Sequence, residues 1–312
     1  MRRLLFLSLG LAALSVAACA PPPPAQQTET RSSRWSVYQD RLLAQGLMRS
    51  ETDPADAPWT AADLTRNFRR IAFDFEADPF ATGRTTSKPR PRVLRRVTRG
   101  PSLRLVGGEA ESRRLIPRLR AFNQVIRQET GLTPVFLSQD AQSGETRRPL
   151  VSFVVLEDRQ WREIGRTGLP RTPDSKLPER FWTGLAQTIR DWHASGSPCG
   201  GTVWSATSDR LQGRVRGEIV TAIIFLRASL PDLLLTACVE EEYAQALGLV
   251  NDDPSVRPSL FNDDGEFARL TTHDRALLRL LYDRRLTTGM ARADAMPIAR
   301  RIAVELARRA GG

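Results

Sequence analysis

Three consecutive carboxylates, Glu240 to Glu242, lie within the otherwise apolar stretch CVEEEYAQALGLVND, from Cys238 to Asp252. The apolar spacing predicts a buried helix that ends at Gly248, because glycine commonly terminates helices. Carboxylates on such a helix can act as a general base or as ligands of a hard cation. The position of the triplet beside a glycine turn therefore raises the question of a metal site.

The stretch resembles the motif H-E-x-x-H-x-x-G-x-x-H of the metzincin zinc peptidases. In that motif three histidines hold zinc, and the glutamate polarises the metal-bound water. With Gly248 as the glycine of the motif, the resemblance makes Glu242 the candidate general base. The three ligand positions hold Glu241, Gln245 and Asn251 in place of histidine. Because neutral amides are poor zinc ligands, the resemblance implies a degenerate site.

Three interpretations of the triplet remain open. It is a solvated helix edge paired with some of the many arginines, or it is the relic of a lost zinc site. The third interpretation is a working site for a hard cation, held by Glu241, Glu242 and either Asp252 or Asp253.

The chain has only two histidines, His193 and His273, which are too few for a three-histidine site. We expect His193 to be an ordinary surface or hydrogen-bonded residue. We expect His273 near a helix N-terminus that is capped by Thr272 or Asp274. The sequence has no P-loop, no G-x-S-x-G and no G-x-G-x-x-G, and we predict no cofactor.

The elements that must position these residues follow from hydrophobic periodicity. A nearly continuous apolar run at 150–157 predicts a central strand. Thr60 with Asp63 predicts a helix start, and Gly131 predicts a helix end. The pattern predicts an α+β fold, as one domain with a central mixed sheet and packed helices. The expected helices lie at 36–49, 59–73, 111–132, 181–196, 238–248, 272–283 and 296–310, and the expected strands at 102–108, 134–139, 150–157, 200–207 and 217–228.

The N-terminus predicts export. A basic start and a short apolar run precede VAAC, at 16–19, and the run is shorter than the ~20 residues that span a bilayer. VAAC resembles the lipobox of bacterial lipoproteins, which implies a lipid on Cys19 and a cell-envelope location. In bacterial lipoproteins, Asp directly after the lipidated cysteine is a signal for retention in the inner membrane. Because Ala20 follows Cys19, we expect the protein in the outer membrane, facing the periplasm. The four prolines that follow predict an extended tether.

With Cys19 carrying lipid, Cys199 and Cys238 remain as a pair in an oxidising compartment. We predict a disulfide between them, the alternative being two buried thiols.

The formal net charge of +11 falls to +9 when the signal peptide leaves, because residues 1–18 contain Arg2, Arg3 and no acid. An exported protein has no access to nucleic acid, so the charge favours anionic envelope components or an acidic protein as partners. The segment 84–104 holds eight basic residues and no acid. We expect it to be a loop, either merely solvated or an anion-binding patch made of Arg92, Arg95, Arg96 and Arg99.

The mature chain also resembles domain-of-unknown-function family 2927, through segments at 46–73, 238–252, 259–274 and 280–290. The resemblance implies an envelope lipoprotein with a degenerate metzincin-like fold. We predict a signal peptide at 1–18, a lipidated tether at 19–34, a metzincin-like domain at 35–295 and a C-terminal helix at 296–312. The expected function is a non-catalytic binding or scaffold module. The alternative is a metal-dependent peptidase or cell-wall hydrolase that uses Glu242.

Overall fold

The computed structural model describes residues 33–74, 93–137, 148–167, 179–206, 214–262 and 264–310, with the backbone alone for 179–181. Ser33 to Gly312 forms one compact unit. The predicted signal peptide, tether and lipidated Cys19 lie outside the described residues. The elements in chain order are α1 Arg34–Ala44, α2 Ala61–Phe73, β1 Ser102–Val106, α3 Glu109–Thr130, β2 Val135–Phe136, β3 Leu150–Leu156, α4 Asp158–Thr167, α5 Glu179–Ser195, β4 Cys199–Ser205, β5 Ile219–Arg227, α6 Asp232–Leu247, the 3-10 helix η1 Leu260–Asn262, α7 Thr272–Leu281 and α8 Arg292–Ala310.

The five strands form one mixed sheet in the order β2-β1-β3-β5-β4. β1 pairs in parallel with β2 and β3, and β3 pairs in parallel with β5. β4 runs antiparallel to β5 and ends the sheet within the described part of the chain. The apolar run of β3 lies at the centre of the sheet, as the sequence predicted.

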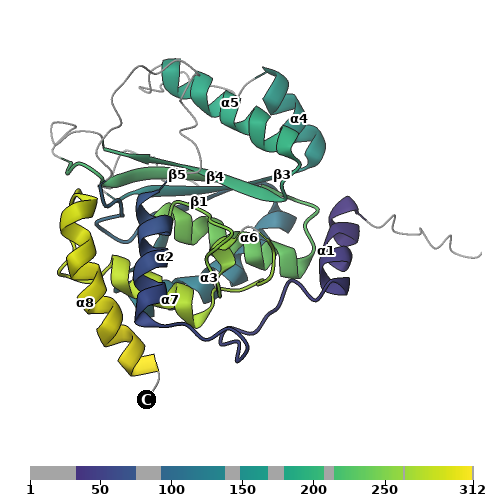
Figure 1. Ribbon diagram of the computed structural model, residues 1–312. Helices are drawn as coiled ribbons and strands as arrows, with labels where there is room; N and C mark the ends of the chain where they lie inside the picture. The colour runs from purple at the N-terminus through teal and green to yellow at the C-terminus, as the bar shows by residue number, and fades with distance from the viewer. Residues whose placement is uncertain are drawn as a thin grey trace, which may run out of the picture. The chain divides into compact units, whose positions relative to one another are not determined.

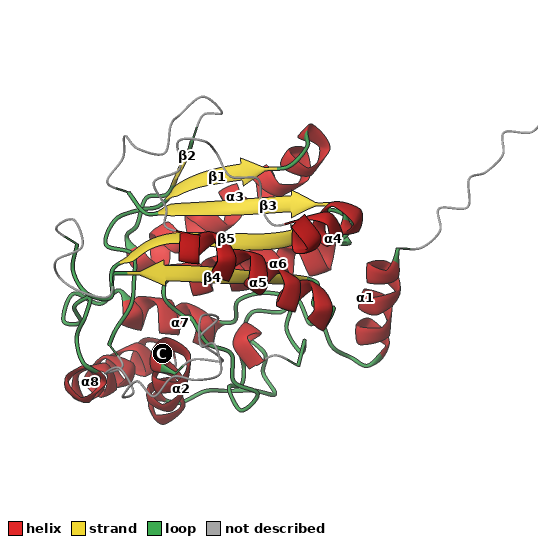
Figure 2. Ribbon diagram, turned by 90° about the horizontal axis from the view of Figure 1, so that it is seen from above, coloured by secondary structure: helices red, strands yellow, loops and turns green. Residues whose placement is uncertain are grey.

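Helices cover both faces of the sheet (Figures 1 and 2). α4 and α5 lie on one face, where Trp161, Leu185, Ile189 and Trp192 pack with Phe225 of β5. α3 and α6 lie on the other face, backed by α2, α7 and α8, and this side holds the larger hydrophobic core. The fold is α+β with a mixed sheet, as predicted.

Two capping boxes set the starts of helices on this larger side. Thr60 and Asp63 cap α2, as the sequence predicted. α7 begins after Thr271, whose side chain accepts from the Asp274 N–H while the Asp274 carboxylate accepts from the Thr271 N–H. The cap of α7 is therefore Thr271 rather than the expected Thr272, with Asp274 as its partner.

The boundaries of the remaining elements differ in detail from the predicted ones. α8 begins at Arg292, before the predicted start at 296. α4 was not predicted, because Trp161 and the partly buried Ile164 are the two side chains that it packs against the core, which is too short a pattern to show a period. Among the described helices, none combines the length and the apolarity that crossing a bilayer requires.

Candidate functional site

A cleft of about 780 Å³ lies along the edge strand β4. α6 forms its floor, and the chain that follows α6 forms a side wall. α1 and α5 contribute to its other walls. The polar and charged residues that line it are Arg95, Thr188, Asp191, Ser195, Ser197, Thr202, Glu241, Glu242, Gln245 and Asp252.

α6 ends at Gly248 for two physical reasons. Gly248 has φ of +128°, a backbone conformation that residues with a Cβ rarely adopt. A Cβ at this position would also lie 2.3 Å from the carbonyl oxygen of Arg95. The turn places Asp252 opposite the last turn of α6, where its carboxylate accepts two contacts from Gln245 Nε2 at 2.8 and 2.9 Å. The glycine turn thus brings a carboxylate into the cleft.

The three glutamates of α6 have different surroundings. Glu240 is buried away from the cleft, where it accepts from Arg269 Nε and from the backbone N–H of Leu270. Burial raises the pKa of the Glu240 carboxyl, against the opposing effect of these two donors. Its role is to connect α6 with the segment that enters α7.

Glu241 and Glu242 both line the cleft. Glu242 is 7% exposed, and a Cβ on Gly201 would lie 2.7 Å from its Oε2. The absence of a side chain at Gly201 therefore lets the carboxylate approach the backbone of β4. The interpretation of the triplet as a solvated helix edge is wrong for Glu240 and Glu242, although the expected arginine contact exists for Glu240.

The three predicted ligand positions do not all meet in the cleft. Glu241 and Gln245 line it, and Asn251 does not. Asn251 is 5% exposed, and its Nδ2 donates to the backbone oxygen of Arg70 at 3.1 Å. Asp252, one residue further along, occupies the corresponding place in the cleft. The motif predicted the turn correctly and its third inward side chain wrongly.

This donor set does not fit zinc. The Nε2 of Gln245 points at Asp252, and an amide nitrogen is not a metal ligand. Within the described ranges, no three side chains of His, Cys, Asp and Glu are arranged to hold a metal ion. We therefore assign no catalytic step to a metal, and the residue placed as general base, Glu242, is a cleft residue without an assigned reaction.

The disulfide predicted between Cys199 and Cys238 is present. It joins the first residue of β4 to the middle of α6, and both cysteines line the cleft. The bond therefore ties the edge strand to the helix that forms the floor.

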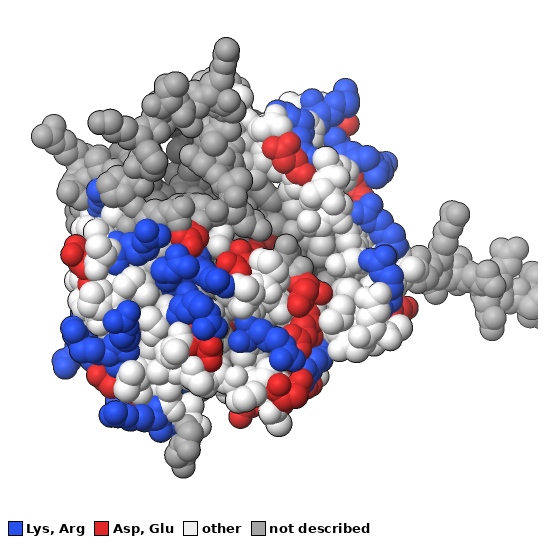
Figure 3. Space-filling view, viewed as in Figure 1, with Lys and Arg blue, Asp and Glu red and all other residues white. Residues whose placement is uncertain are grey.

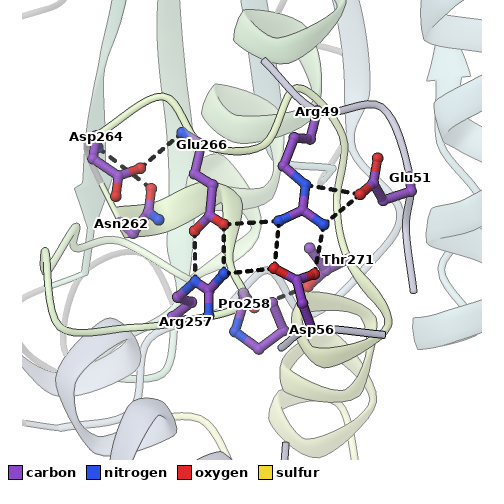
Figure 4. Close-up of polar contacts among 9 residues, drawn as sticks. All are labelled: Arg49, Glu51, Asp56, Arg257, Pro258, Asn262, Asp264, Glu266 and Thr271. Carbon is purple, nitrogen blue, oxygen red and sulfur yellow. Dashed lines mark hydrogen bonds and ion pairs between the residues drawn. The ribbon is translucent and has the colours of Figure 1, made fainter. Parts of the chain in front are cut away.

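A ring of two arginines and two carboxylates holds the side wall (Figure 4). Arg49 contacts Asp56 at 2.6 Å and Glu266 at 3.1 Å. Arg257 contacts the same two carboxylates at 3.1 and 2.8 Å. The backbone N–H of Met48 donates to the oxygen of Gly265 beside the ring. Because Met48 and Gly265 line the cleft, the ring fixes the shape of this wall.

α1 forms a further wall with Tyr38 and Leu42. It is anchored through Trp35, whose ring centroid lies 5.0 Å from the buried guanidinium of Arg227. Arg227 also donates to Asp158 at 2.5 Å and stacks on Trp192. One buried cation thus connects α1, α4, α5 and β5.

The four arginines of the predicted anion-binding patch do not share one environment. Arg95 lines the cleft, and Arg99 is exposed. Arg96 is not available for a ligand, since it donates to the backbone oxygens of Leu281 and Leu286 at 2.6 and 2.7 Å. Burial lowers its pKa. Arg92 lies outside the described residues, so its part in anion binding stays a prediction. The described segment from residue 93 to 101 contains no helix, as expected.

The two histidines lie apart from the cleft lining. His193 Nδ1 is 3.3 Å from Arg227 NH1, and burial together with that cation lowers its pKa. His273 is fully buried, and its Nε2 is 3.1 Å from Asn67 Nδ2. Its ring also meets Trp59 edge-on. His193 therefore has a hydrogen-bonding neighbour and His273 lies in the first turn of α7, as the sequence interpretation expected.

Sequence reasoning missed Asp191 and the contribution of α1 to the cleft. Asp191 lies on the polar side of an amphipathic helix, where nothing in the sequence distinguishes it from a solvated residue. Tyr38 precedes the family-like segments, so the resemblance gave no signal for it.

The fold and the cleft define an α+β domain with a carboxylate-lined cleft at the antiparallel edge of its sheet. The model of the family described as "Protein of unknown function (DUF2927)" matches residues 61–301. Because this match covers most of the chain, the protein belongs to that family, as the resemblance indicated. No curated protein and no solved structure matches the chain.

Proposed function

We propose that the protein is a lipid-anchored envelope module that binds an extended polypeptide segment in the cleft without cleaving it. The observation that carries the proposal is the position of β4, which ends the described sheet and lines the cleft with residues 199–203. An edge strand presents backbone N–H and C=O groups that a further strand can pair with. A peptide bound in this way would lie along β4, above the side chains of α6.

The charge of the cleft restricts the class of peptide that it can bind. Its lining contains four acidic residues and one arginine, in a protein whose formal charge is +11. We therefore expect bound segments to carry a basic side chain that faces Glu241 and Asp252.

We expect no cleavage because the amide side chains at two of the metal-ligand positions are poor zinc ligands. The fold itself would be compatible with a peptidase. Three features support a degenerate zinc-peptidase fold of the metzincin kind: the antiparallel edge strand, the helix ended by Gly248, and the turn η1, which contacts α6 at a place comparable to the methionine turn of the metzincins. Gln245 and Asn251 are committed to hydrogen bonds with Asp252 and with the Arg70 carbonyl. The side chains at these two metal-ligand positions are thus engaged in hydrogen bonds within the protein.

Selection from a library of displayed ten-residue peptides tests the binding function. The protein used is the compact unit from Ser33 to Gly312, which contains the whole described core. We expect enriched basic peptides that slow hydrogen exchange of β4 amides and emerge intact by mass spectrometry. Gln245→Arg should weaken their binding, and Arg159→Glu, an exposed change on α4, should not. Cleaved peptides, or peptides indifferent to Gln245→Arg, would refute the proposal.

The anchor rests on the sequence VAAC at 16–19 and has its own test. In the bacterial host, we expect radiolabelled palmitate to enter the wild-type chain and to be absent from Cys19→Ser. Equal incorporation in both chains would show that Cys19 carries no lipid.

A further inference from the structure

A second concave surface lies on the outside of the molecule, between α2 and α8. It is a groove of about 640 Å³, separate from the cleft. The two helices pack closely, because Ala295, Ala299 and Ala303 recur every four residues on the buried side of α8. The groove is lined by Ala61, Ala62, Thr65, Arg66, Arg69, Met296, Arg300 and Val304.

The spacing of these residues makes the groove amphipathic. Met296, Arg300 and Val304 are four residues apart and so lie on one side of α8. Ala61, Thr65 and Arg69 form the equivalent row on α2. On α8 an arginine stem thus lies between two apolar side chains, and on α2 two alanines and Thr65 precede Arg66 and Arg69.

The charge of this surface is strongly positive. Three arginines and no acid line the groove. α2 and α8 together hold eight arginines against three acids, and Figure 3 shows basic groups gathered over both helices. Arg66 contacts Asp63 at 2.6 Å, and Arg69 contacts Asp74 at 3.6 Å. The side chain of Arg300 is exposed and makes no ion pair or hydrogen bond with any described residue.

We propose that this groove binds the phosphate head group and glycerol region of an anionic phospholipid, so that the α2–α8 face lies on a membrane surface. Arg300, Arg66 and Arg69 would contact the phosphate, since a guanidinium offers paired donors to its oxygens. Met296 and Val304 would contact the apolar part of the lipid. Free phosphate would satisfy the arginines alone and leave these apolar side chains without a role.

This inference is independent of the cleft and of the lipid on Cys19, and its test uses the compact unit from Ser33 to Gly312, which lacks that cysteine. The measurement is co-sedimentation with vesicles of phosphatidylglycerol and phosphatidylcholine, compared with pure phosphatidylcholine, at ~0.1 M salt. We expect saturable binding to the anionic vesicles only.

Four variants separate binding in the groove from attraction by net charge. One cation near an anionic surface is worth about a factor of five in affinity, so Arg300→Gln should weaken binding about fivefold and Arg300→Glu about thirtyfold. Val304→Ser should weaken it roughly threefold to tenfold. Arg159→Glu is the matched reversal, because Arg159 is exposed on α4, on the opposite face of the sheet. It should change the affinity less than about twofold.

Circular dichroism and thermal unfolding establish first that each variant is folded. Equal losses for Arg300→Glu and Arg159→Glu would overturn the inference, because they would show attraction by net charge alone. Comparable binding to neutral vesicles would also overturn it, and so would unchanged binding in Val304→Ser. If the anionic vesicles do not bind while an acidic protein does, the surface has the other kind of partner and the lipid assignment is wrong.

Discussion

Reduction of the Cys199–Cys238 disulfide should destabilise the protein by an amount set by the loop it closes. The two cysteines are 39 residues apart in the sequence. Loop-closure entropy for a segment of this length gives about 4 kcal/mol at 25 °C. For a unit of about 280 residues the entropy of unfolding is roughly 0.6 kcal/mol per kelvin. We therefore expect the melting temperature to fall by about 7 °C.

The assay is thermal unfolding of the unit from Ser33 to Gly312, which contains Cys199 and Cys238 and no other cysteine. Circular dichroism follows the unfolding of oxidised protein, of protein kept reduced, and of the double variant Cys199→Ala/Cys238→Ala. The double variant should melt at or slightly below the reduced protein, because Cys238 is 1% exposed and truncation leaves a small cavity. The reasoning would be refuted if reduced and oxidised protein melted within about 1 °C of each other.

Three further changes test the contacts that hold α1, α6 and α7 in place. The pKa of the Glu240 carboxyl is higher in the folded state than in the unfolded state. Protonation of Glu240 therefore stabilises the fold fully at pH values below the unfolded-state pKa, and this contribution is lost as pH rises through the folded-state pKa. Chemical unfolding should therefore show wild type losing stability relative to Glu240→Gln as pH rises above the ordinary carboxyl pKa of 4.5, and the opposite slope would contradict the burial argument. Asp274 is fully buried and accepts from Ser259, Leu260 and Thr271, so Asp274→Ala should cost about 3–5 kcal/mol in urea unfolding. A loss under about 1 kcal/mol would show that those donors find other acceptors. Trp35→Ala should cost about 3 kcal/mol and speed hydrogen exchange in α1, since Trp35 anchors that helix on Arg227. Unchanged exchange in α1 would show that other contacts hold it.

Much of the fold was predictable because local signals agreed with the tertiary structure. The apolar stripe of α3 and its end at Gly131 appear in the sequence as in the structure. The same holds for the Thr60–Asp63 cap and for the central strand β3. The disulfide followed from counting cysteines once export had been inferred. α4 carried a weaker signal, because Trp161 and Ile164 are the two apolar side chains that it packs against the core.

The candidate site was predictable only in part, for a geometric reason. Residue spacing located the helix and the turn at Gly248, but it could not say whether Asn251 or Asp252 points into the cleft. That choice depends on the Arg70 carbonyl, which draws Asn251 towards α2. Spacing also grouped Arg96 with its basic neighbours, although its guanidinium donates to backbone oxygens at the end of α7 and in the turn that follows. The groove between α2 and α8 is built from two helices at opposite ends of the domain sequence, which no local pattern brings together.

The most direct test of a binding module without metal catalysis is the zinc content of the purified protein. Untagged protein is expressed in zinc-supplemented medium, dialysed and measured by mass spectrometry of the metal, with Glu241→Ala prepared in parallel. We expect zinc far below one ion per chain and no difference between the two proteins, because the amides at Gln245 and Asn251 are poor ligands. One zinc ion per wild-type chain that is lost in Glu241→Ala would contradict the proposed function and favour a metallopeptidase that uses Glu242.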